Sequence, residues 1–236
     1  MNEWIDDLSV EIAEGNACVL VTVAGVRGSA PREVGAKMLV TERETIGTIG
    51  GGQLEYKCTQ IACNALRDRQ DGSSARKFPL GANLGQCCGG VVEVLFESYC
   101  AERPAWLDEL REAYQRRQPV IMVTVGDRKY LITSEGECLF SEESDIDADL
   151  LQEAVQILTQ NEAAKRDNDV LFEPIVGSSL HVAVFGAGHV GTATFAGSTA
   201  DETFFPRPRP ATFSLSRPTG RSWKWPRCRP VAVIWS

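Results

Sequence analysis

Two glycine-rich segments carry residue types that could bind a small anionic ligand. In the first, Gly50, Gly51 and Gly52 stand directly before a segment that predicts a helix. Glycines at a helix start let main-chain N–H groups approach an anion closely, and the helix dipole favours negative charge there. A flexible turn is the alternative. Because three consecutive glycines carry an entropic cost that a plain turn does not require, the pattern favours ligand contact, with Gln53 preferred over Glu55 as the contacting side chain.

The second segment places two adjacent thiols between glycines. Residues 84–90 read Leu-Gly-Gln-Cys-Cys-Gly-Gly and lead into a strand. Oxidisable sulfur on a thinly covered loop can touch a ligand. In a strand-like backbone Cys87 and Cys88 face opposite ways, so one of them would reach it. Together the two segments indicate a site for a phosphate-bearing, sulfur-containing small molecule.

An arginine loop follows the first predicted strand. Residues 27–35 contain Arg32 among Gly28, Pro31 and Gly35, which shape a loop. A guanidinium group matches phosphate oxygens with two parallel hydrogen bonds. A plain hairpin with solvated arginines remains the alternative interpretation.

The other nucleophile and metal-ligand residues form no catalytic pattern. His181 and His189 are the only histidines, so residues 1–180 contain no Ser/His or Cys/His pair, which disfavours a hydrolase. No Cys-x-x-Cys pair has zinc spacing. The remaining cysteines are interpreted as buried structural thiols: Cys18, Cys58, Cys63, Cys100 and Cys138.

A dinucleotide-type turn begins late in the chain. Gly186, Gly188 and Gly191 follow an apolar strand at residues 180–185, as in the opening of a Rossmann unit. A helix, a second strand and an acidic residue should come next, but prolines between 206 and 210 block a central strand. The dinucleotide fold therefore begins here and is not completed.

These segments require a framework of helices and strands. Apolar periodicity predicts helices at residues 4–12, 53–69, 104–117 and 147–164, and strands at 17–26, 37–40, 45–49, 75–80, 90–97, 119–125, 129–133, 137–140, 171–175 and 180–185. We expect an α/β protein: an α+β N-terminal region with a mixed sheet, then an incomplete Rossmann-like unit. The expected divisions are residues 1–100, 101–178, 179–193 and 194–236. No internal repeat is recognised.

Composition narrows the class of protein. The 236 residues are 43% hydrophobic and 24% charged, as in ordinary globular proteins, and a net charge of −8 disfavours nucleic-acid binding. No apolar run reaches the roughly 18 residues of a membrane span. Acidic residues stand where a signal peptide would be basic, so we expect a cytoplasmic protein with reduced thiols.

The C-terminal segment differs from the rest in composition. Residues 194–236 hold six of the eleven prolines and three of the five tryptophans, and their charges are mostly basic. Such composition without periodicity indicates a shifted reading frame or a disrupted gene near Ala193, giving an aberrant, disordered tail. A natural basic disordered tail is the alternative.

Four segments together resemble the XdhC/CoxI family of accessory proteins, which assist molybdenum hydroxylases such as xanthine dehydrogenase. They are Gly-Ser-Ala-Pro-Arg-Glu-Val-Gly-Ala-Lys-Met at 28–38, Ile-Gly-Gly-Gly-Gln-Leu-Glu at 49–55, Gln-Cys-Cys-Gly-Gly at 86–90 and His-Val-Ala-Val-Phe-Gly-Ala-Gly-His-Val-Gly at 181–191. The resemblance covers about residues 1–193. The family's Rossmann-like domain should continue well beyond that point, and here it does not.

The resemblance implies a chaperone for purine catabolism rather than an enzyme. Such a protein would bind molybdenum cofactor (molybdopterin) as cargo, support its sulfuration by a cysteine desulfurase and deliver it to an apo xanthine dehydrogenase-type hydroxylase. A homodimer is a further expectation from the resemblance. Cys88 is the expected contact to sulfur or molybdenum, with Cys87 second. The residues expected to bind the cofactor are Arg32, Gly50, Gly51, Gly52, Gln53, Gln86, Cys87, Cys88, Gly89, Gly90, Gly186, Gly188 and Gly191.

Two other functions remain open. An NAD(P)-dependent oxidoreductase could be built on residues 186–191, although the ribose-binding acid and an evident proton donor are missing. The chain could also be a non-functional truncated remnant.

Overall fold

The computed structural model describes residues 4–69, 71–81, 89–101, 103–142 and 146–176, together with the backbone of residues 182–185 and 232–235. The chain divides into two compact units, one of them Asn2–Gly177 and the other containing Ser178–Ser236. In the latter, β11 (Val182–Phe185) pairs antiparallel with β12 (Ala232–Trp235). Residues 194–231 lie outside the described residues, so the expected disorder of the tail stays a prediction.

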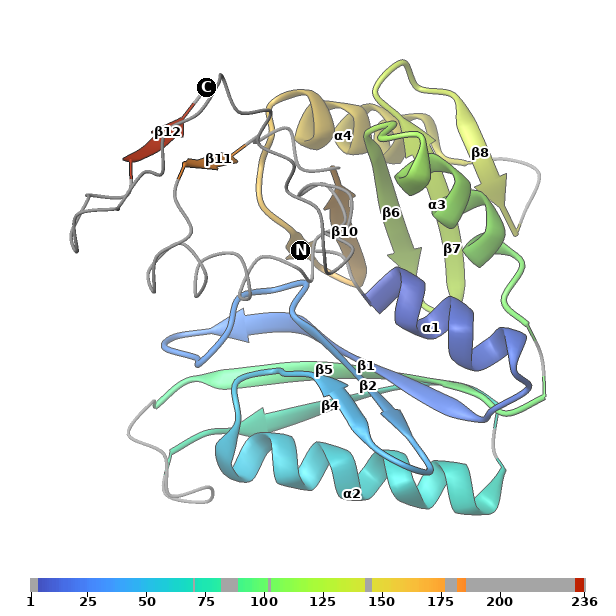
Figure 1. Cartoon of the computed structure of the whole chain (residues 1–236), viewed down its shortest axis with the longest axis vertical. Helices are drawn as coiled ribbons and strands as arrows, with labels where there is room; N and C mark the ends of the chain where they lie inside the picture. Colours follow the sequence, from blue (N-terminus) through green and yellow to red (C-terminus); the bar gives the residue numbers. More distant parts are fainter. Residues whose placement is uncertain are drawn as a thin grey trace, which may run out of the picture. The chain divides into compact units, whose positions relative to one another are not determined.

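The unit Asn2–Gly177 contains two five-stranded sheets (Figure 1). In the first the order is β3-β2-β1-β5-β4, with bounds β1 Cys18–Arg27, β2 Lys37–Thr41, β3 Thr45–Gly47, β4 Gly72–Pro79 and β5 Val91–Tyr99. In the second it is β8-β7-β6-β10-β9, with bounds β6 Val120–Val125, β7 Arg128–Thr133, β8 Cys138–Ser141, β9 Lys165–Asp167 and β10 Val170–Ile175. The helices are α1 Trp4–Ala13, α2 Gly52–Asp68, α3 Trp106–Gln115 and α4 Ala148–Thr159.

The expected α+β character is confirmed, with one correction. Every strand pair in the described part of the chain is antiparallel, so the sheets are not mixed. Short connections favour this result, because antiparallel strands need only a hairpin whereas parallel strands need a long crossover. No described helix is long and apolar enough to cross a membrane.

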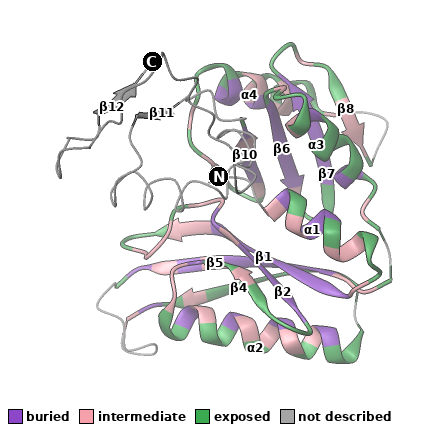
Figure 2. Ribbon diagram, viewed as in Figure 1, coloured by how far each residue is buried: buried purple, intermediate pink, exposed green. Residues whose placement is uncertain are grey.

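Each sheet of this unit has one helix on its outer face. In β1, Val19, Val21 and Val23 point to the α2 side, where α2 buries a stripe at helical spacing: Leu54, Cys58, Ala62 and Leu66. On the second sheet, α4 packs through a stripe of its own: Ala154, Ile157 and Leu158. Figure 2 shows the buried residues concentrated in the strands and on the sheet-facing sides of these helices.

A third core lies between the sheets and includes the remaining two helices. It contains Ile5 and Leu8 of α1, Leu107 and Leu110 of α3, and inward-facing strand residues such as Leu20. Trp4 and Trp106 are the first residues of these two helices, and the centroids of their rings lie 6.3 Å apart. From one side of the unit to the other, the order is α2, first sheet, second sheet and α4. Helices α1 and α3 fill part of the space between the sheets, and elsewhere the sheets meet directly through Ala24, Leu95 and Leu171.

The second half of this unit repeats the first, contrary to the expectation from sequence. The order α1-β1-β2-β3-α2-β4-β5 recurs as α3-β6-β7-β8-α4-β9-β10, and the strand order within the two sheets is the same. In the first half, Thr22 pairs with Lys37 of β2 and Leu95 of β5. In the second half, the partners of Thr124 are again a lysine of β7 and a leucine of β10, namely Lys129 and Leu171.

Sequence comparison conceals this repeat because the loops differ in length. Residues 4–26 and 106–128 align without a gap, with a tryptophan opening each helix and Val-Thr-Val in each first strand. Further along, the offset between equivalent residues changes from one connection to the next, so no fixed period survives.

Reciprocal buried ion pairs join the two halves. The Lys37 ammonium lies 2.7 Å from the Glu173 carboxylate of the second sheet, donates to the Thr22 hydroxyl at 2.8 Å and stands 4.9 Å from the centre of the Trp4 ring. Both charged side chains are almost fully buried. A buried pair with an added hydrogen bond is the arrangement in which buried charge is tolerated.

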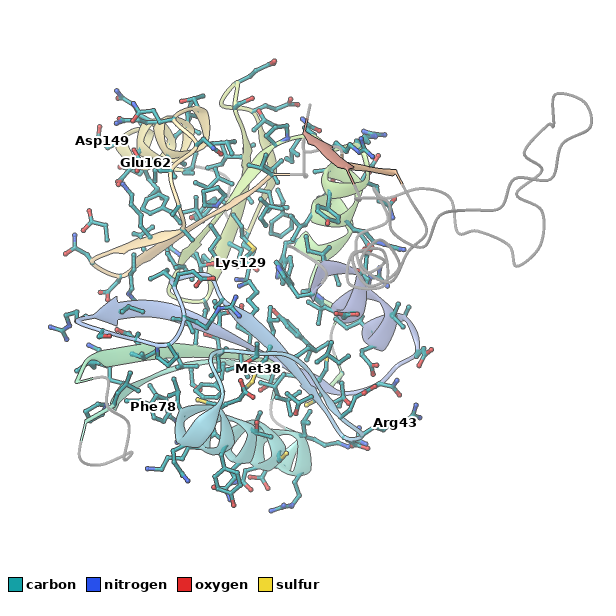
Figure 3. The ribbon with its side chains drawn as sticks, turned by 60° about the vertical axis from the view of Figure 1, so that its left-hand side comes forward. Met38, Arg43, Phe78, Lys129, Asp149 and Glu162 are labelled. Carbon is teal, nitrogen blue, oxygen red and sulfur yellow. The ribbon has the colours of Figure 1, made fainter. Side chains whose placement is uncertain are left out.

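The same interaction occurs a second time, with the lysine supplied by the second half and the glutamate by the first. The Lys129 ammonium lies 2.9 Å from the Glu97 carboxylate of the first sheet, donates to the Thr124 hydroxyl at 3.0 Å and stands 5.3 Å from the Trp106 ring centre. Figure 3 labels Lys129 at its place between the sheets. Each half thus contributes one lysine and one glutamate to the other, as in an isologous dimer interface.

The structure corrects one helix and adds one strand. The helix expected at residues 147–164 ends at Thr159, and Asn161 adopts a left-handed conformation with φ of 53°. Asparagine tolerates this conformation and stops a helix there. The released chain forms β9, which was not expected. β9 is an edge strand of the second sheet. The equivalent edge strand of the first sheet is β4, and nearly all of its residues are exposed.

Candidate functional site

The glycine corner at residues 48–52 is closed by Glu55. One oxygen of the Glu55 carboxylate accepts hydrogen bonds from the Thr48 hydroxyl at 2.5 Å and from the N–H groups of Ile49 and Gly51 at 3.0 Å each. Gly51 is the N-cap residue of α2 and has no side chain to cap the helix, so a glutamate in the first turn reaches back instead. The anion at this helix start is therefore the protein's own carboxylate.

These hydrogen bonds fix the charge of Glu55. Partial burial acts to raise the pKa of the carboxyl, but the bonds from Thr48 and from the N–H groups of Gly51, Ile49 and Gly50 outweigh burial and lower the pKa. A carboxyl whose pKa is lowered by folding stabilises the folded state above its unfolded pKa, and this stability is lost as the pH falls through the lowered value.

We expect Glu55→Gln to make the protein less stable near neutral pH and less sensitive to acid. Wild-type stability should decrease once the pH drops below the ordinary glutamate pKa of about 4.3. The Glu55→Gln variant should lose less stability at this low pH, because it has no carboxylate to protonate at this position. Thermal unfolding from about pH 6 to about pH 3 brackets that pKa and measures both effects. Glu42→Gln, in the exposed turn before β3, is the control. Equal acid sensitivity of wild type and Glu55→Gln would contradict the assignment.

The arginine loop at residues 28–36 contacts both glycine-rich segments. A Cβ on Gly90 would lie 2.2 Å from the Ser29 carbonyl oxygen and 2.7 Å from that of Arg27. A Cβ on Gly50 would lie 2.5 Å from the Pro31 Cβ, and Gly50 has a φ of 119° that favours glycine. The loop therefore brings the end of the thiol segment and the glycine corner together, and two of the glycines are required for these close approaches.

Other expected site residues stand in more open surroundings. Within the described part of the chain, nothing lies within 4 Å of where a Cβ on Gly51 or Gly89 would stand, and Gly52 and Gln53 are exposed. These positions leave room for a ligand beside the glycine corner, although its own N–H groups are partly engaged by the glutamate of the first helical turn.

The side chain of Arg32 is paired within its own loop. Its guanidinium lies 3.1 Å from the exposed Glu33 carboxylate. A hydrogen bond from Arg32 is the main cause of a lowered Glu33 pKa. Solvent screens an exposed pair of this kind, so Arg32 can exchange this partner for another anion at little cost.

The second half of the repeat shows what the fold requires without these segments. Where the first half has residues 28–36 between β1 and β2, the second has only Gly126 and Asp127 between β6 and β7. Where the first has residues 80–90 between β4 and β5, the second has only Asn168 and Asp169 between β9 and β10. The same strands are joined in both, so the longer connections of the first half are not needed for folding.

The helix on the outer face of each sheet, α2 or α4, also begins differently in the two halves. In α4 the Asp147 carboxylate caps the helix by accepting from the N–H groups of Asp149 and Leu150. This is the usual helix cap. In α2 three glycines replace it. Of the three segments that the sequence singled out in the first half, two are thus additions to a common framework, and the glycine corner is a substitution within it.

Several expected site residues lie outside the described residues. They are Gln86, Cys87 and Cys88 of the thiol segment and Gly186, Gly188 and Gly191 of the dinucleotide-type turn. Their assignments stay predictions. Among the described residues no group of three or more His, Cys, Asp or Glu side chains could hold a metal ion.

The other cysteines largely follow expectation. Cys18 and Cys58 are buried, and burial raises the pKa of each thiol to about 12. Cys63 and Cys100 are partly buried. Cys138 is exposed on β8, which corrects the expectation of a buried thiol; its position in an edge strand explains the difference.

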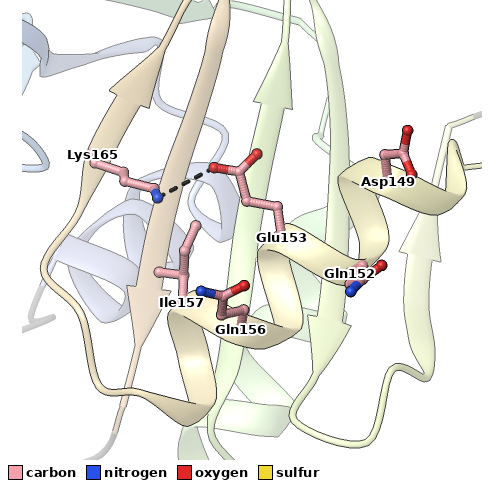
Figure 4. A pocket seen from close by; sticks show the side chains of 6 residues that line it. All are labelled: Asp149, Gln152, Glu153, Gln156, Ile157 and Lys165. Atoms are coloured by element: carbon pink, nitrogen blue, oxygen red, sulfur yellow. Dashed lines mark ion pairs between the residues drawn. The ribbon is translucent and has the colours of Figure 1, made fainter.

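Cavities in the described part of the chain include one beside the arginine loop and one beside α4. One, of about 450 Å³, lies beside the arginine loop and is lined by Gly25, Val26, Arg27, Val34, Lys77, Val91, Glu93, Arg166 and Asn168. The other, of about 310 Å³, lies between α4 and β9 (Figure 4). There Lys165 is paired with Glu153 at 3.2 Å, and none of the expected site residues takes part. None of the expected site residues lines the first cavity either, but Val34 of the arginine loop and Val91, the residue after Gly90, do, so the first cavity adjoins the candidate site.

Sequence reasoning passed over Glu55 and missed Lys77 and Arg166. An acidic residue in the first turn of a helix is a common cap, and that signal could have favoured Glu55 over Gln53. Lys77 and Arg166 had no signal, because only the folded arrangement of the two halves brings β4 and β9 to one cavity.

Comparison with known proteins relates the N-terminal part of the chain to a family. Residues 11–78 match the sequence model of the XdhC and CoxI family. Among solved structures, the chain is similar to a protein from Bacillus halodurans described as a xanthine dehydrogenase, with a TM-score of 0.56 and 20% identity. The match covers 74% of this chain and 53% of that chain, so this chain spans about half the length of that protein. The likeness is one of fold. No curated protein matches the chain.

Proposed function

We propose that this chain, whose residues 11–78 match the XdhC and CoxI family, is an accessory protein in the maturation of a xanthine dehydrogenase-type hydroxylase. In finer terms, it binds molybdenum cofactor as cargo, supports the sulfuration of that cofactor with a cysteine desulfurase, and delivers it to the apo-hydroxylase. It acts as a cytoplasmic chaperone in purine catabolism rather than as an enzyme.

One observation carries the proposal: the arginine loop contacts both glycine-rich segments. Gly90 lies against Ser29 and Arg27, and Gly50 lies against Pro31. Residues 28–36 and 80–90 both exceed the two-residue turns that suffice in the second half. Connections that are longer than folding needs, and that include open glycines or adjoin them in the sequence, support a binding role.

The residues suit a cofactor that carries sulfur, metal and a flat ring. Cys88 directly precedes Gly89, which is exposed and has no atom of a described residue within 4 Å of an added Cβ. A thiolate is a soft ligand suited to metal–sulfur chemistry. Gly51, Gly52 and Gln53 offer an accessible surface for the pterin. The contacts of the arginine loop with both segments support a site in which the pterin and its sulfur-bound metal lie side by side.

Cys88→Ala tests the proposal directly. We expect the purified variant to lose nearly all co-purifying molybdopterin, measured by fluorescence after oxidation, because the thiol contact to the metal or its sulfur is gone. Cys138→Ala, which removes an exposed thiol from β8, should retain wild-type cofactor content. Equal cofactor content in wild type and Cys88→Ala after gel filtration would contradict the role of Cys88. Absence of cofactor from every form, after expression in molybdopterin-producing cells, would contradict the function.

A further inference from the structure

The first sheet extends beyond the second at the end that carries the arginine loop. The β6–β10 ladder stops at the pair of Val125 with Val170, and the chain then turns. The equivalent β1–β5 ladder shifts register after Val23 and continues to the pair of Arg27 with Val91. The overhanging part of the first sheet and the β9–β10 turn of the second half enclose the cavity of about 450 Å³.

This cavity combines an apolar wall with three cations. The cations are Arg27, Lys77 and Arg166, which come from three different strands. The wall is formed by three valines: Val26, Val34 and Val91. A concave, partly apolar space of this volume with a few convergent polar groups is the usual form of a small-molecule site.

One carboxylate in the cavity pairs with two of the cations and leaves the lining with a net positive charge. Glu93 lies 3.2 Å from the Arg166 guanidinium and 3.7 Å from the Lys77 ammonium, and both Glu93 and Arg166 are mostly buried. Arg166 also lies 3.5 Å from Asp169, which is almost fully exposed and therefore screened by solvent. Among the charged residues that line the cavity, three are positive and one is negative. An anionic ligand is therefore favoured.

A glycine in β1 makes room for this arrangement. A Cβ on Gly25 would lie 3.4 Å from the Arg166 Cδ and 3.5 Å from the Glu93 Cβ. A Cβ at this position would make ordinary van der Waals contacts, whereas a side chain larger than alanine would extend into the space that the arginine and the glutamate share. Gly25 therefore lies where the arginine of the second half packs against β1.

From these contacts we infer that the cavity binds the phosphate group of the pterin cofactor, with Arg27, Lys77 and Arg166 as its partners. This inference rests on the proposed function and replaces the helix start of α2 as the phosphate position. At that helix start the N–H groups of Ile49 and Gly51 already bind the carboxylate of residue 55. A phosphate placed there would have to displace a carboxylate, whereas the cavity offers an excess of positive charge.

The cavity is within reach of the thiol segment along the chain. Val91 lines it, and Cys88 precedes Val91 by three residues. A chain spans at most about 3.6 Å per residue, so three residues of any conformation span no more than about 11 Å. One cofactor molecule that carries a phosphate at one end and sulfur at the other can therefore use both the cavity and the thiol segment.

Fluorescence titration of the full chain with hydroxymethylpterin phosphate and with unphosphorylated hydroxymethylpterin tests the inference. Wild type should bind the phosphate ester at least about tenfold more tightly, because charge-assisted hydrogen bonds carry that difference. Lys77→Gln should remove most of this preference, and Arg27→Gln should act in the same direction. Arg76→Gln is the matched control, because Arg76 is the neighbour of Lys77 on β4 and faces the opposite side of the sheet.

The outcomes separate this inference from the proposed function. If wild type binds both pterins equally, or if Arg76→Gln lowers phosphate preference as much as Lys77→Gln does, the cavity is not the phosphate site while pterin binding stands. If inorganic phosphate binds as tightly as the pterin ester and depends on Lys77, the cavity is a general anion site and its assignment to the cofactor is wrong. If neither pterin binds, both proposals fail.

Discussion

Lys37→Met is expected to lower the free energy of unfolding by about 3–5 kcal/mol, because it leaves the Glu173 carboxylate buried without its partner. Lys129→Met should have a similar effect through Glu97. Urea unfolding followed by fluorescence measures the change as a lower transition midpoint. Replacing both members, as Lys37→Met with Glu173→Leu, should recover most of the loss, since apolar side chains of similar volume often replace a buried ion pair without cost.

The matched control for this experiment is a surface ion pair. Arg116 and Glu112 are paired one helical turn apart and are largely exposed. Arg116→Met should leave the unfolding midpoint almost unchanged, because solvent screens exposed pairs. A Lys37→Met protein as stable as Arg116→Met, or a double variant no better than the single one, would show that the ion pairs do not join the two halves.

Gly90→Ala is expected to destabilise the protein by about 1–3 kcal/mol and to abolish cofactor retention. The added methyl group would lie 2.2 Å from the Ser29 carbonyl oxygen of the arginine loop and 2.7 Å from the Arg27 carbonyl oxygen at the end of β1, so the loop and the thiol segment must separate. The measurement is co-purifying molybdopterin together with the thermal midpoint.

Gly89→Ala provides the comparison for this variant. A Cβ at Gly89 meets no atom of a described residue within 4 Å, and the two glycines are neighbours in the same segment. The Gly89→Ala protein should keep both stability and cofactor content. If Gly89→Ala and Gly90→Ala lost the cofactor equally, contact between the arginine loop and Gly90 would have no part in binding.

Much of the framework could be predicted from periodicity. The buried stripe of α2, from Leu54 to Leu66, follows helical spacing, and β1 is a continuous apolar run, so α2 and β1 lie where they were expected. The exposed strands β4 and β9 have no such pattern. β4 begins earlier than expected and β9 was missed, since their pairing with β5 and β10 rather than their own burial defines them.

The candidate site was predictable in its loops and not in its electrostatics. Glycines at 50 and 90 could be recognised from sequence because close backbone approach excludes other residues. The sequence interpretation preferred Gln53 as the partner of the glycine corner, although the acidic residue Glu55 in the first helical turn was the signal that could have corrected this preference. Arg166 is far from the motifs in sequence, and only the packing of one half on the other brings it to them.

Because β4 is an edge strand, it is a place where two molecules could associate by strand pairing. A strand at the border of a sheet presents unpaired N–H and carbonyl groups that can recruit a strand from another chain and start aggregation. Arg76 and Lys77 place two adjacent positive charges on this border, and Pro79 lacks an N–H group at its end. Two copies that met at β4 would bring like charges together. Lys77 therefore lines the cavity and also opposes the pairing of β4 with a strand of another molecule.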